Sequence, residues 1–243
     1  MATGDIKGTL SGLPRIHTME VSRDSHHYIS LSLLHAWLER EALPHAKGVL
    51  LDYGCGGQPY KRFFRDHITK YIGADVAAAE GTTLDIEISP NQHLPLPDES
   101  VDTILSTQTL EHIRNVGFYL KECARLLKPD GILILTAPMQ WRHHEVPYDF
   151  LRFTRYGLMD LLENNGFVTK SMTACGGVYA LIGQIFLNHL SERGVQRKLL
   201  YSIINRLSLW LDKKYPDDDE TLNWMCIAER KDTTSQGRIR ERR

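Results

Sequence analysis

The chain has 243 residues, of which 42% are hydrophobic and 24% charged, and its formal net charge at pH 7 is -1. This near-neutral balance argues against nucleic acid as a partner, because nucleic-acid-binding domains are usually basic. No stretch reaches the ~18 apolar residues of a membrane-spanning helix, and residues 1–15 lack the apolar core of a signal peptide. We therefore expect a globular protein of the cytoplasm.

A loose lead-in over residues 1–22 is followed by a predicted helix that begins at Asp24 or Ser25 and ends near Ala42. Either residue is a good helix cap. Ile29, Leu33 and Trp37 recur at helical spacing and form the apolar face. We therefore take residues 1–47 as a lead-in and a covering helix.

A glycine-rich turn follows the first predicted strand. The apolar run 49–51 leads to Asp52 and then to Gly54, Gly56 and Gly57. Asp75 follows about 20 residues later, at the end of a second strand-like run over 71–76. A glycine turn after one strand and an acid at the tip of the next are typical of the nucleoside-binding half of a Rossmann-type sheet, where the acid binds ribose hydroxyls.

Asp52 makes this signal more specific. Phosphate-binding turns lack an acid at this position, because it would repel a pyrophosphate. An acid instead favours a cationic ligand, and S-adenosylmethionine carries both an amino group and a sulfonium.

Strands and helices alternate along the rest of the chain. Predicted helices span 59–67, 116–127 and about 154–165, and predicted strands span 71–76, 82–87 (ending near Asp85), 101–106, 132–137, 167–173 and 221–230. This alternation predicts a doubly wound α/β sheet.

Four motifs together resemble the class I S-adenosylmethionine-dependent methyltransferases. They are Asp52-x-Gly54-x-Gly56 with Gln58 in place of a third glycine, Leu94 to Asp102, Leu110-Glu111-His112, and Leu126 to Gly131. The resemblance covers residues 48 to about 167. It implies a Rossmann-like domain over 48–230 with seven mostly parallel strands, the last antiparallel beside the fifth.

The resemblance also implies roles for single residues toward S-adenosylmethionine as cofactor. The methionine end is assigned to Asp52 and the backbone of Gly54, Cys55 and Gly56; the ribose to Asp75; the adenine to Val76, Asp85 and Ile86; and the sulfonium to the segment from Ser106 to Gln108. Candidates for binding the substrate are Tyr28, His112, Trp141, Tyr148 and Arg152.

The polar and aromatic stretch over 139–154 begins where the fifth strand ends, the edge at which parallel sheets bind ligands. A hydroxyl acceptor must lose a proton, and histidine suits that role near pH 7. His144 is the first candidate for the base and His143 the second, with Asp149 orienting the imidazole and Arg152 binding an anionic group. A metal site is not predicted, since the spacing of the histidines and acids here matches no metal motif.

About 45 residues separate the last two predicted strands. Residues 177–214 are rich in apolar residues at helical spacing and predict a helical insertion. It covers the site or forms a homodimer contact, or residues 178–211 lie on a membrane surface with the help of nearby arginines and lysines. The polar tail over 231–243 is predicted to be disordered.

We expect the chain to methylate an oxygen of a small molecule, such as a sugar or another hydroxyl-bearing metabolite, including a lipid-linked glycan. RNA or protein methylation and a non-catalytic cofactor-binding scaffold are the alternatives.

Overall fold

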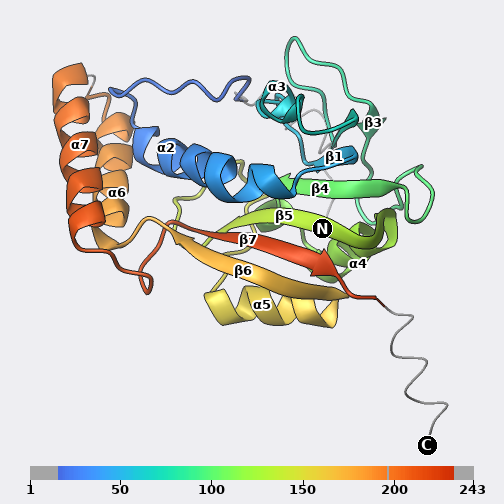
Figure 1. The fold of residues 1–243 in the computed structure, drawn as a ribbon. Helices are drawn as coiled ribbons and strands as arrows, with labels where there is room; N and C mark the ends of the chain where they lie inside the picture. The colour runs from blue at the N-terminus through green and yellow to red at the C-terminus, as the bar shows by residue number, and fades with distance from the viewer. Residues whose placement is uncertain (1–15, 196, 233–243) are drawn as a thin grey trace, which may run out of the picture.

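The computed structural model describes residues 16–195 and 197–232 (Figure 1). The first part of the predicted lead-in and nearly all of the predicted disordered tail lie outside the described residues. One seven-stranded sheet has the order β3-β2-β1-β4-β5-β7-β6. The strands are β1 (Val49–Tyr53), β2 (Lys70–Asp75), β3 (Ile86–Glu87), β4 (Val101–Thr107), β5 (Leu127–Pro138), β6 (Phe167–Cys175) and β7 (Asn223–Arg230).

The pairing of the strands confirms the predicted fold class. The pairs β1–β2, β1–β4, β2–β3 and β4–β5 are parallel. Strand β7 inserts antiparallel between β5 and β6. The carboxyl ends of β1, β2 and β4 therefore meet at one edge of the sheet, where open parallel sheets bind their ligands.

Side chains that alternate along the strands build a core on each face of the sheet. On one face, Leu50, Leu105 and Ile134 pack with Trp37 and Leu38. These two belong to α2 (Tyr28–Trp37) and to the wider turn η1 (Leu38–Ala42) that continues it. Short helical segments α3 (Lys61–Phe64) and η2 (Leu43–His45) complete this face.

On the opposite face the neighbouring residues Leu51, Ile104 and Leu135 pack against two further helices. These are α4 (Val116–Leu126) and α5 (Arg155–Asn164). Figure 1 shows α2 and α5 on opposite sides of the sheet. Since neighbouring residues of a strand point to opposite faces, the continuous apolar runs in β1, β4 and β5 reflect burial on both faces.

Several predicted boundaries were wrong. Helix α2 begins at Tyr28 rather than at Asp24 or Ser25, and the Ser25 hydroxyl accepts a hydrogen bond from the His27 N–H just before the helix starts. Helix α3 is one turn long, and β3 has two residues rather than six. Strand β5 starts at Leu127, because the segment 128–131 continues the strand through a left-handed residue, Asp130.

The predicted helical insertion consists of α6 (Val178–Glu192) and α7 (Lys198–Lys214), which lie side by side at one end of the molecule (Figure 1). They approach closely because Gly183 lacks a side chain: a Cβ there would lie 2.1 Å from the Ser208 hydroxyl oxygen. The Asp212 carboxylate of α7 accepts hydrogen bonds from the N–H groups of Gly177 and Ala180 at the start of α6. These contacts bind the two helices into one unit.

The outer face of this pair is apolar and exposed. Its members are Ile182, Ile185 and Phe186 on α6 and Leu199, Ile203, Leu207 and Trp210 on α7, and we call these seven residues the apolar face. Within the described part of the chain, no helix combines the length and the hydropathy that crossing a membrane requires.

Candidate active site

The glycine turn joins the ends of β1 and β2. The N–H groups of Gly54 and Cys55 both donate to the Ala74 carbonyl oxygen, at 2.8 and 3.1 Å. Gly54 has a φ of +92°, and a Cβ there would lie 2.5 Å from the Thr109 hydroxyl oxygen. Glycine is therefore required at this position both by backbone conformation and by space.

Asp75, at the tip of β2, is held by backbone donors. Its two carboxylate oxygens accept from the N–H groups of Gly56 and Val76, both at 2.7 Å. A carboxylate oxygen can accept more than one hydrogen bond. Asp75 therefore still has acceptor capacity for a ligand in the cavity that it lines.

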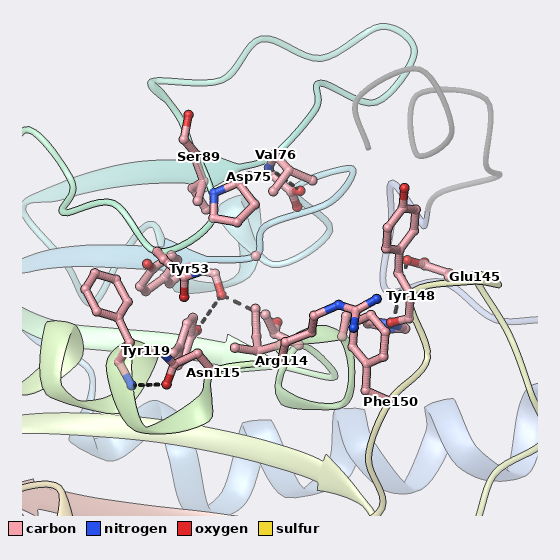
Figure 2. Close-up of a pocket in the computed structure, with 18 of the residues that line it drawn as sticks. Tyr53, Asp75, Val76, Ser89, Arg114, Asn115, Tyr119, Glu145, Tyr148 and Phe150 are labelled. Carbon is pink, nitrogen blue, oxygen red and sulfur yellow. Dashed lines mark hydrogen bonds and ion pairs between the residues drawn. The ribbon is translucent and has the colours of Figure 1, made fainter. Parts of the chain in front are cut away.

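The first cavity has a volume of about 190 Å³ and lies between β2 and α4. Figure 2 shows Asp75, Val76 and Ser89 on one side and Tyr53 and Tyr119 on the other. Apolar and aromatic side chains supply most of the remaining wall, namely Ile88, Pro90, Ile113, Phe118 and Phe150. A carboxylate at one edge and flat apolar walls suit the diol and the base of a nucleoside.

Three of the predicted cofactor residues lie away from this cavity. Ser106 is fully buried and accepts a hydrogen bond from the Tyr119 hydroxyl at 2.8 Å. Asp85 is exposed and accepts from the Gly73 N–H at 2.8 Å, and neither it nor Ile86 is among the described residues that line the two cavities. Because β3 is so short, the loop after it, with Ser89 and Pro90, provides the wall that we had expected from Asp85 and Ile86.

Asp52 also lies beneath the cavities rather than in their walls. It is fully buried, and its Oδ2 accepts a hydrogen bond from the Tyr71 hydroxyl at 2.5 Å, while its Oδ1 has no hydrogen-bond partner. Burial raises the pKa of Asp52 to about 7, the Tyr71 hydrogen bond opposes this rise, and the charge of Asp75 adds to it. Asp52 therefore lies under the glycine turn without lining either cavity.

A second cavity of about 660 Å³ opens on the other side of the glycine turn. It is lined by Cys55 and Gly56 of the turn, by His26 and His27 before α2, by Trp141, Arg142, His143 and His144 after β5, and by Asn188 of α6 and Asn223 of β7. The two cavities share Gly54, Gln108, His112 and Glu145 in their walls. These four residues mark the junction of the cavities.

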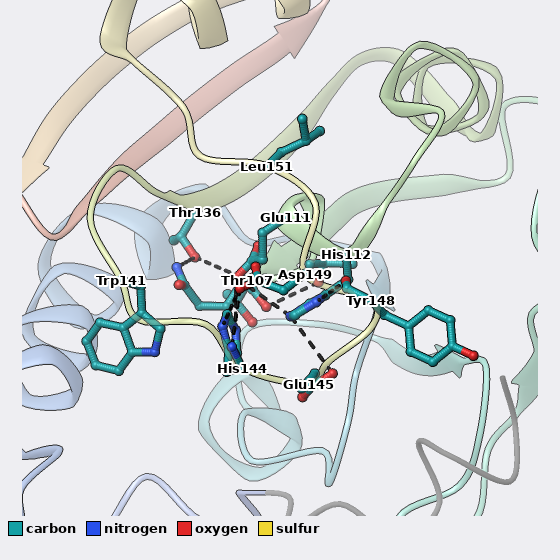
Figure 3. Close-up of polar contacts among 12 residues, drawn as sticks. Thr107, Glu111, His112, Thr136, Trp141, His144, Glu145, Tyr148, Asp149 and Leu151 are labelled. Atoms are coloured by element: carbon teal, nitrogen blue, oxygen red, sulfur yellow. Dashed lines mark hydrogen bonds and ion pairs between the residues drawn. The ribbon is translucent and has the colours of Figure 1, made fainter. Parts of the chain in front are cut away.

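Beside the junction lies a cluster of three side chains, Glu111, His112 and His144, turned toward one another (Figure 3). The Glu111 Oε1 lies 4.0 Å from the His112 Nε2 and 3.9 Å from the His144 Nε2. Burial raises the pKa of Glu111 to about 8, and the positive charge of Arg152 opposes this rise. Neither side-chain oxygen of Glu111 has a hydrogen-bond partner. Burial likewise lowers the pKa of His144, and the neighbouring His112 adds to this effect.

The loop after β5 separates the two candidate bases. His144 faces the junction with 28% of its side chain exposed, whereas 91% of the His143 side chain is exposed. Asp149 accepts a hydrogen bond from the His144 main-chain N–H at 3.2 Å, and its Oδ2 lies 3.5 Å from the His144 Nδ1. The predicted role of Asp149 in orienting His144 therefore has a geometric basis.

Arg152 does not face either cavity, contrary to its predicted role in binding an anionic group. Its guanidinium forms two hydrogen bonds with Asp149, at 2.6 and 2.9 Å, and others with the carbonyl oxygens of Trp141, Arg142 and Leu151. The side chain thus fixes the loop, and the partners on its own chain occupy its donors.

The remaining substrate candidates divide between the cavities. His112 lies at the junction, Tyr148 lines the first cavity and Trp141 the second. Tyr28 lies at the start of α2 outside both walls, and its neighbour His27 takes the position beside Trp141, with ring centroids 6.1 Å apart. No sequence pattern pointed to Asn188 or Asn223, because only the packing of α6 and β7 brings them to the site.

Sequence comparisons match only part of this chain. Residues 51–135 match the family described as "Methyltransferase domain". A probable S-adenosylmethionine-dependent methyltransferase of Mycolicibacterium smegmatis is 30% identical over 96 residues, which are 37% of each chain. A ubiquinone biosynthesis O-methyltransferase of Rhodopseudomonas palustris is 30% identical over 109 residues, which are 38% of this chain and 41% of that one. The chain thus spans about two fifths of the length of these curated relatives.

Solved structures resemble the chain over most of its length. The cyclase SpnF superimposes with a TM-score of 0.57 at 21% identity, covering 93% of this chain and 90% of that one. The 1,6-didemethyltoxoflavin-N1-methyltransferase of Burkholderia thailandensis, solved with S-adenosylhomocysteine, gives 0.52 at 16% identity, covering 86% and 80%. These likenesses concern the fold, which serves more than one reaction. The chain therefore contains a segment, residues 51–135, that is similar to methyltransferase domains, and it shares its fold with these solved structures over most of its length.

Proposed function

We propose that the chain binds S-adenosylmethionine in the first cavity and transfers its methyl group to a hydroxyl oxygen of a small molecule in the second. The observation that carries this proposal is the junction at Gly54, Gln108, His112 and Glu145, where the two cavities share their walls. Methyl transfer is an in-line displacement, so much of its acceleration comes from aligning the two reactants at one point.

The residues of the first cavity suit the cofactor. Asp75 would accept hydrogen bonds from the ribose hydroxyls, and Val76 would pack on the adenine. The methionine end would extend from the first cavity across the junction, where the backbone of Gly54 and then of Cys55 and Gly56 would hold it, above the buried carboxyl group of Asp52. When bound, the cofactor supplies an electrophilic methyl group on a sulfonium, which leaves as a neutral thioether.

The second cavity favours a hydroxylated acceptor, and we propose a sugar or a similar metabolite. The Trp141 ring offers a flat face, and the side-chain amides of Asn188 and Asn223 offer both donors and acceptors. The relative from Rhodopseudomonas palustris is named as an O-methyltransferase, which supports oxygen as the methylated atom. As the new oxygen–carbon bond forms, the hydroxyl proton must leave, and His112 and His144 are the nearest imidazoles at the junction.

A screen of hydroxylated metabolites tests this function. Formation of S-adenosylhomocysteine is followed with each compound, and mass spectrometry of the product identifies the methylated atom. In parallel, calorimetry with S-adenosylhomocysteine compares the wild type with Asp75→Ala. We expect binding at least about tenfold weaker in the variant, the loss of one or two hydrogen bonds to a charged acceptor. The exposed Asp66→Ala is the matched control and should bind like the wild type.

Equal binding by Asp75→Ala and the wild type would contradict the assignment of the ribose site. Cofactor binding with no turnover on any metabolite, RNA or protein acceptor would instead support the non-catalytic scaffold.

We also propose that the apolar face of α6 and α7 lies on an anionic membrane surface. Helix α7 carries Lys198, Arg206, Lys213 and Lys214, which are exposed. Its only acid, Asp212, turns inward to the start of α6. A positively charged rim around apolar side chains is complementary to anionic lipid, whereas two copies of the same basic face would repel each other. Such contact would bring a lipid-linked acceptor to the enzyme.

Flotation with vesicles of phosphatidylglycerol and phosphatidylcholine tests this contact. The wild type should float with these vesicles at low salt, and Ile203→Glu should reduce the bound fraction several-fold, because a charge would enter the interface. Val168→Glu is the control, since Val168 is an exposed apolar residue on the edge strand β6. Failure of the wild type to float, or a dimer in sedimentation that Ile203→Glu dissociates, would reject the membrane proposal.

A further inference from the structure

The cluster of Glu111, His112 and His144 beside the junction brings together three side chains that can each offer one ligand atom to a cation. The Glu111 side chain is 1% exposed, and neither of its oxygens has a hydrogen-bond partner. The His112 Nε2 lies 4.0 Å and the His144 Nε2 lies 3.9 Å from Glu111 Oε1. These distances are too long for a hydrogen bond. A fully buried carboxyl group without a hydrogen-bond partner is costly, and a cation at the centre of the cluster would give it a partner.

The surroundings of the two histidines set which ring nitrogen carries the proton. The His112 Nδ1 lies 2.8 Å from the Tyr148 carbonyl oxygen, and the His144 Nδ1 lies 3.2 Å from the Arg142 carbonyl oxygen. A carbonyl only accepts, so each Nδ1 must be the protonated nitrogen. In the neutral imidazole this leaves a lone pair on each Nε2, and both Nε2 atoms face Glu111. Carbonyl contacts of this kind are typical of histidines that bind metals.

A second layer of contacts fixes this arrangement. The Asp149 carboxylate accepts a hydrogen bond from the main-chain N–H of His144 and two more from the Arg152 guanidinium. The Glu145 Oε2 lies 3.9 Å from the His112 Nε2 on the side of the cavity (Figure 3). A fourth ligand is therefore within reach of the same centre.

We propose that Glu111, His112 and His144 bind a divalent transition-metal cation at the junction of the two cavities. One ligand atom from each lies within 4.8 Å of the others. Bonds of roughly 2.1 Å to one ion bring such atoms to about 3–3.5 Å from each other, so each side chain needs to move by less than about 1 Å. Two imidazoles with a carboxylate suit Mn²⁺, Fe²⁺, Co²⁺ or Zn²⁺ better than Mg²⁺, which prefers oxygen.

The metal site itself does not depend on the proposed function, but its role in the reaction does. A cation at the junction would bind the hydroxyl oxygen of the acceptor and make that hydroxyl more acidic, so that its proton could pass to solvent water as the oxygen–carbon bond forms. The His144 Nε2 would then be a ligand, which replaces the role of base that the sequence predicted for it. The acceptor would be an oxygen compound that binds a cation.

Co²⁺ is the probe for the test, because its visible absorption reports coordination by imidazole. The full chain is treated with a chelator, dialysed and titrated with CoCl₂. We expect one Co²⁺ per chain with a ligand-field absorption band, and affinities at least about tenfold weaker for Glu111→Gln and for His144→Ala. The control is His143→Ala, which removes the neighbouring exposed histidine and should keep the band.

Binding of S-adenosylhomocysteine is measured on the same samples in the presence of chelator. Retained binding in Glu111→Gln shows that the variant is folded, so that loss of its Co²⁺ band then supports the proposal. Absence of the band in the wild type, or a band of equal strength in both ligand variants, overturns the metal site and leaves the proposed methyl transfer standing. Loss of cofactor binding in the wild type would instead reject the proposed function, whatever the Co²⁺ result.

Discussion

The cofactor side of the site and the helical insertion are held together in different ways. At the glycine turn, the contacts join residues close in sequence, such as Gly56 to Asp75 and Cys55 to Ala74. The insertion is held by contacts across the whole chain: the Gln184 side-chain amide donates to the His26 carbonyl oxygen, and that of Asn205 donates to the Arg23 carbonyl oxygen.

Because of this difference, we expect sequence motifs at the glycine turn and none in the helical insertion. A turn that closes within about 20 residues needs particular residues at fixed spacing, and such a pattern is visible in the sequence. A helix pair that packs on α2 needs only apolar residues and a few polar contacts, which leave no recognisable spacing. The glycine turn therefore has a recognisable sequence pattern, while the contacts of the helical insertion have none.

Among the changes that test this difference, we expect the largest change in the free energy of unfolding for a substitution of Asp52, on the cofactor side. Its pKa is raised from 3.8 to about 7, chiefly by burial. Between these values the unfolded state has lost the proton and the folded state keeps it, so this group makes the folded wild type less stable as the pH rises. Asp52→Asn removes that dependence. Its unfolding free energy relative to the wild type should rise by roughly 2–4 kcal/mol between pH 4 and pH 8.

Urea unfolding followed by circular dichroism at several pH values measures this change. A difference between Asp52→Asn and the wild type that stays constant with pH would mean that the Asp52 carboxylate is solvated, contrary to its burial in the structure.

A smaller effect is expected from a matched pair of glycine substitutions, one on each side of the comparison. Gly183→Ala in α6 would place a Cβ 2.1 Å from the Ser208 hydroxyl oxygen and 3.0 Å from Ile29 Cδ1. We expect it to destabilise the protein by about 1–3 kcal/mol through overpacking. Gly117→Ala in α4 would meet its nearest atom only at 3.6 Å, and it should stabilise the protein by up to about 1 kcal/mol.

Thermal unfolding of the two variants and the wild type measures both changes. If Gly183→Ala is neutral, then the close approach of α6 and α7 at Gly183 does not limit stability, and the other contacts of the insertion, such as those of Asp212 with Gly177 and Ala180, are sufficient. A loss of stability in Gly117→Ala would show that α4 is under a constraint that its backbone does not reveal.

Much of the fold was predictable because local chemistry decides it. Leu50 and Leu51 in one buried strand, the glycines at 54 and 56, and the Thr154 cap of α5 each depend on neighbours in sequence. The predicted extent of β3 was wrong, since a strand at the edge of a sheet ends where its single partner, β2, stops pairing with it. The length of that partnership is a tertiary property.

The sequence by itself determined the sheet, the glycine turn and the acid at the tip of β2, because steric rules and hydrogen bonding act over a few residues. Only the tertiary structure decided which polar groups meet at the junction. It buried Glu111 without a partner between two imidazoles, turned Arg152 toward its own loop, and brought Asn188 of the insertion to the second cavity. Burial, distance and competition for donors depend on the packed chain, and no spacing in the sequence encodes them.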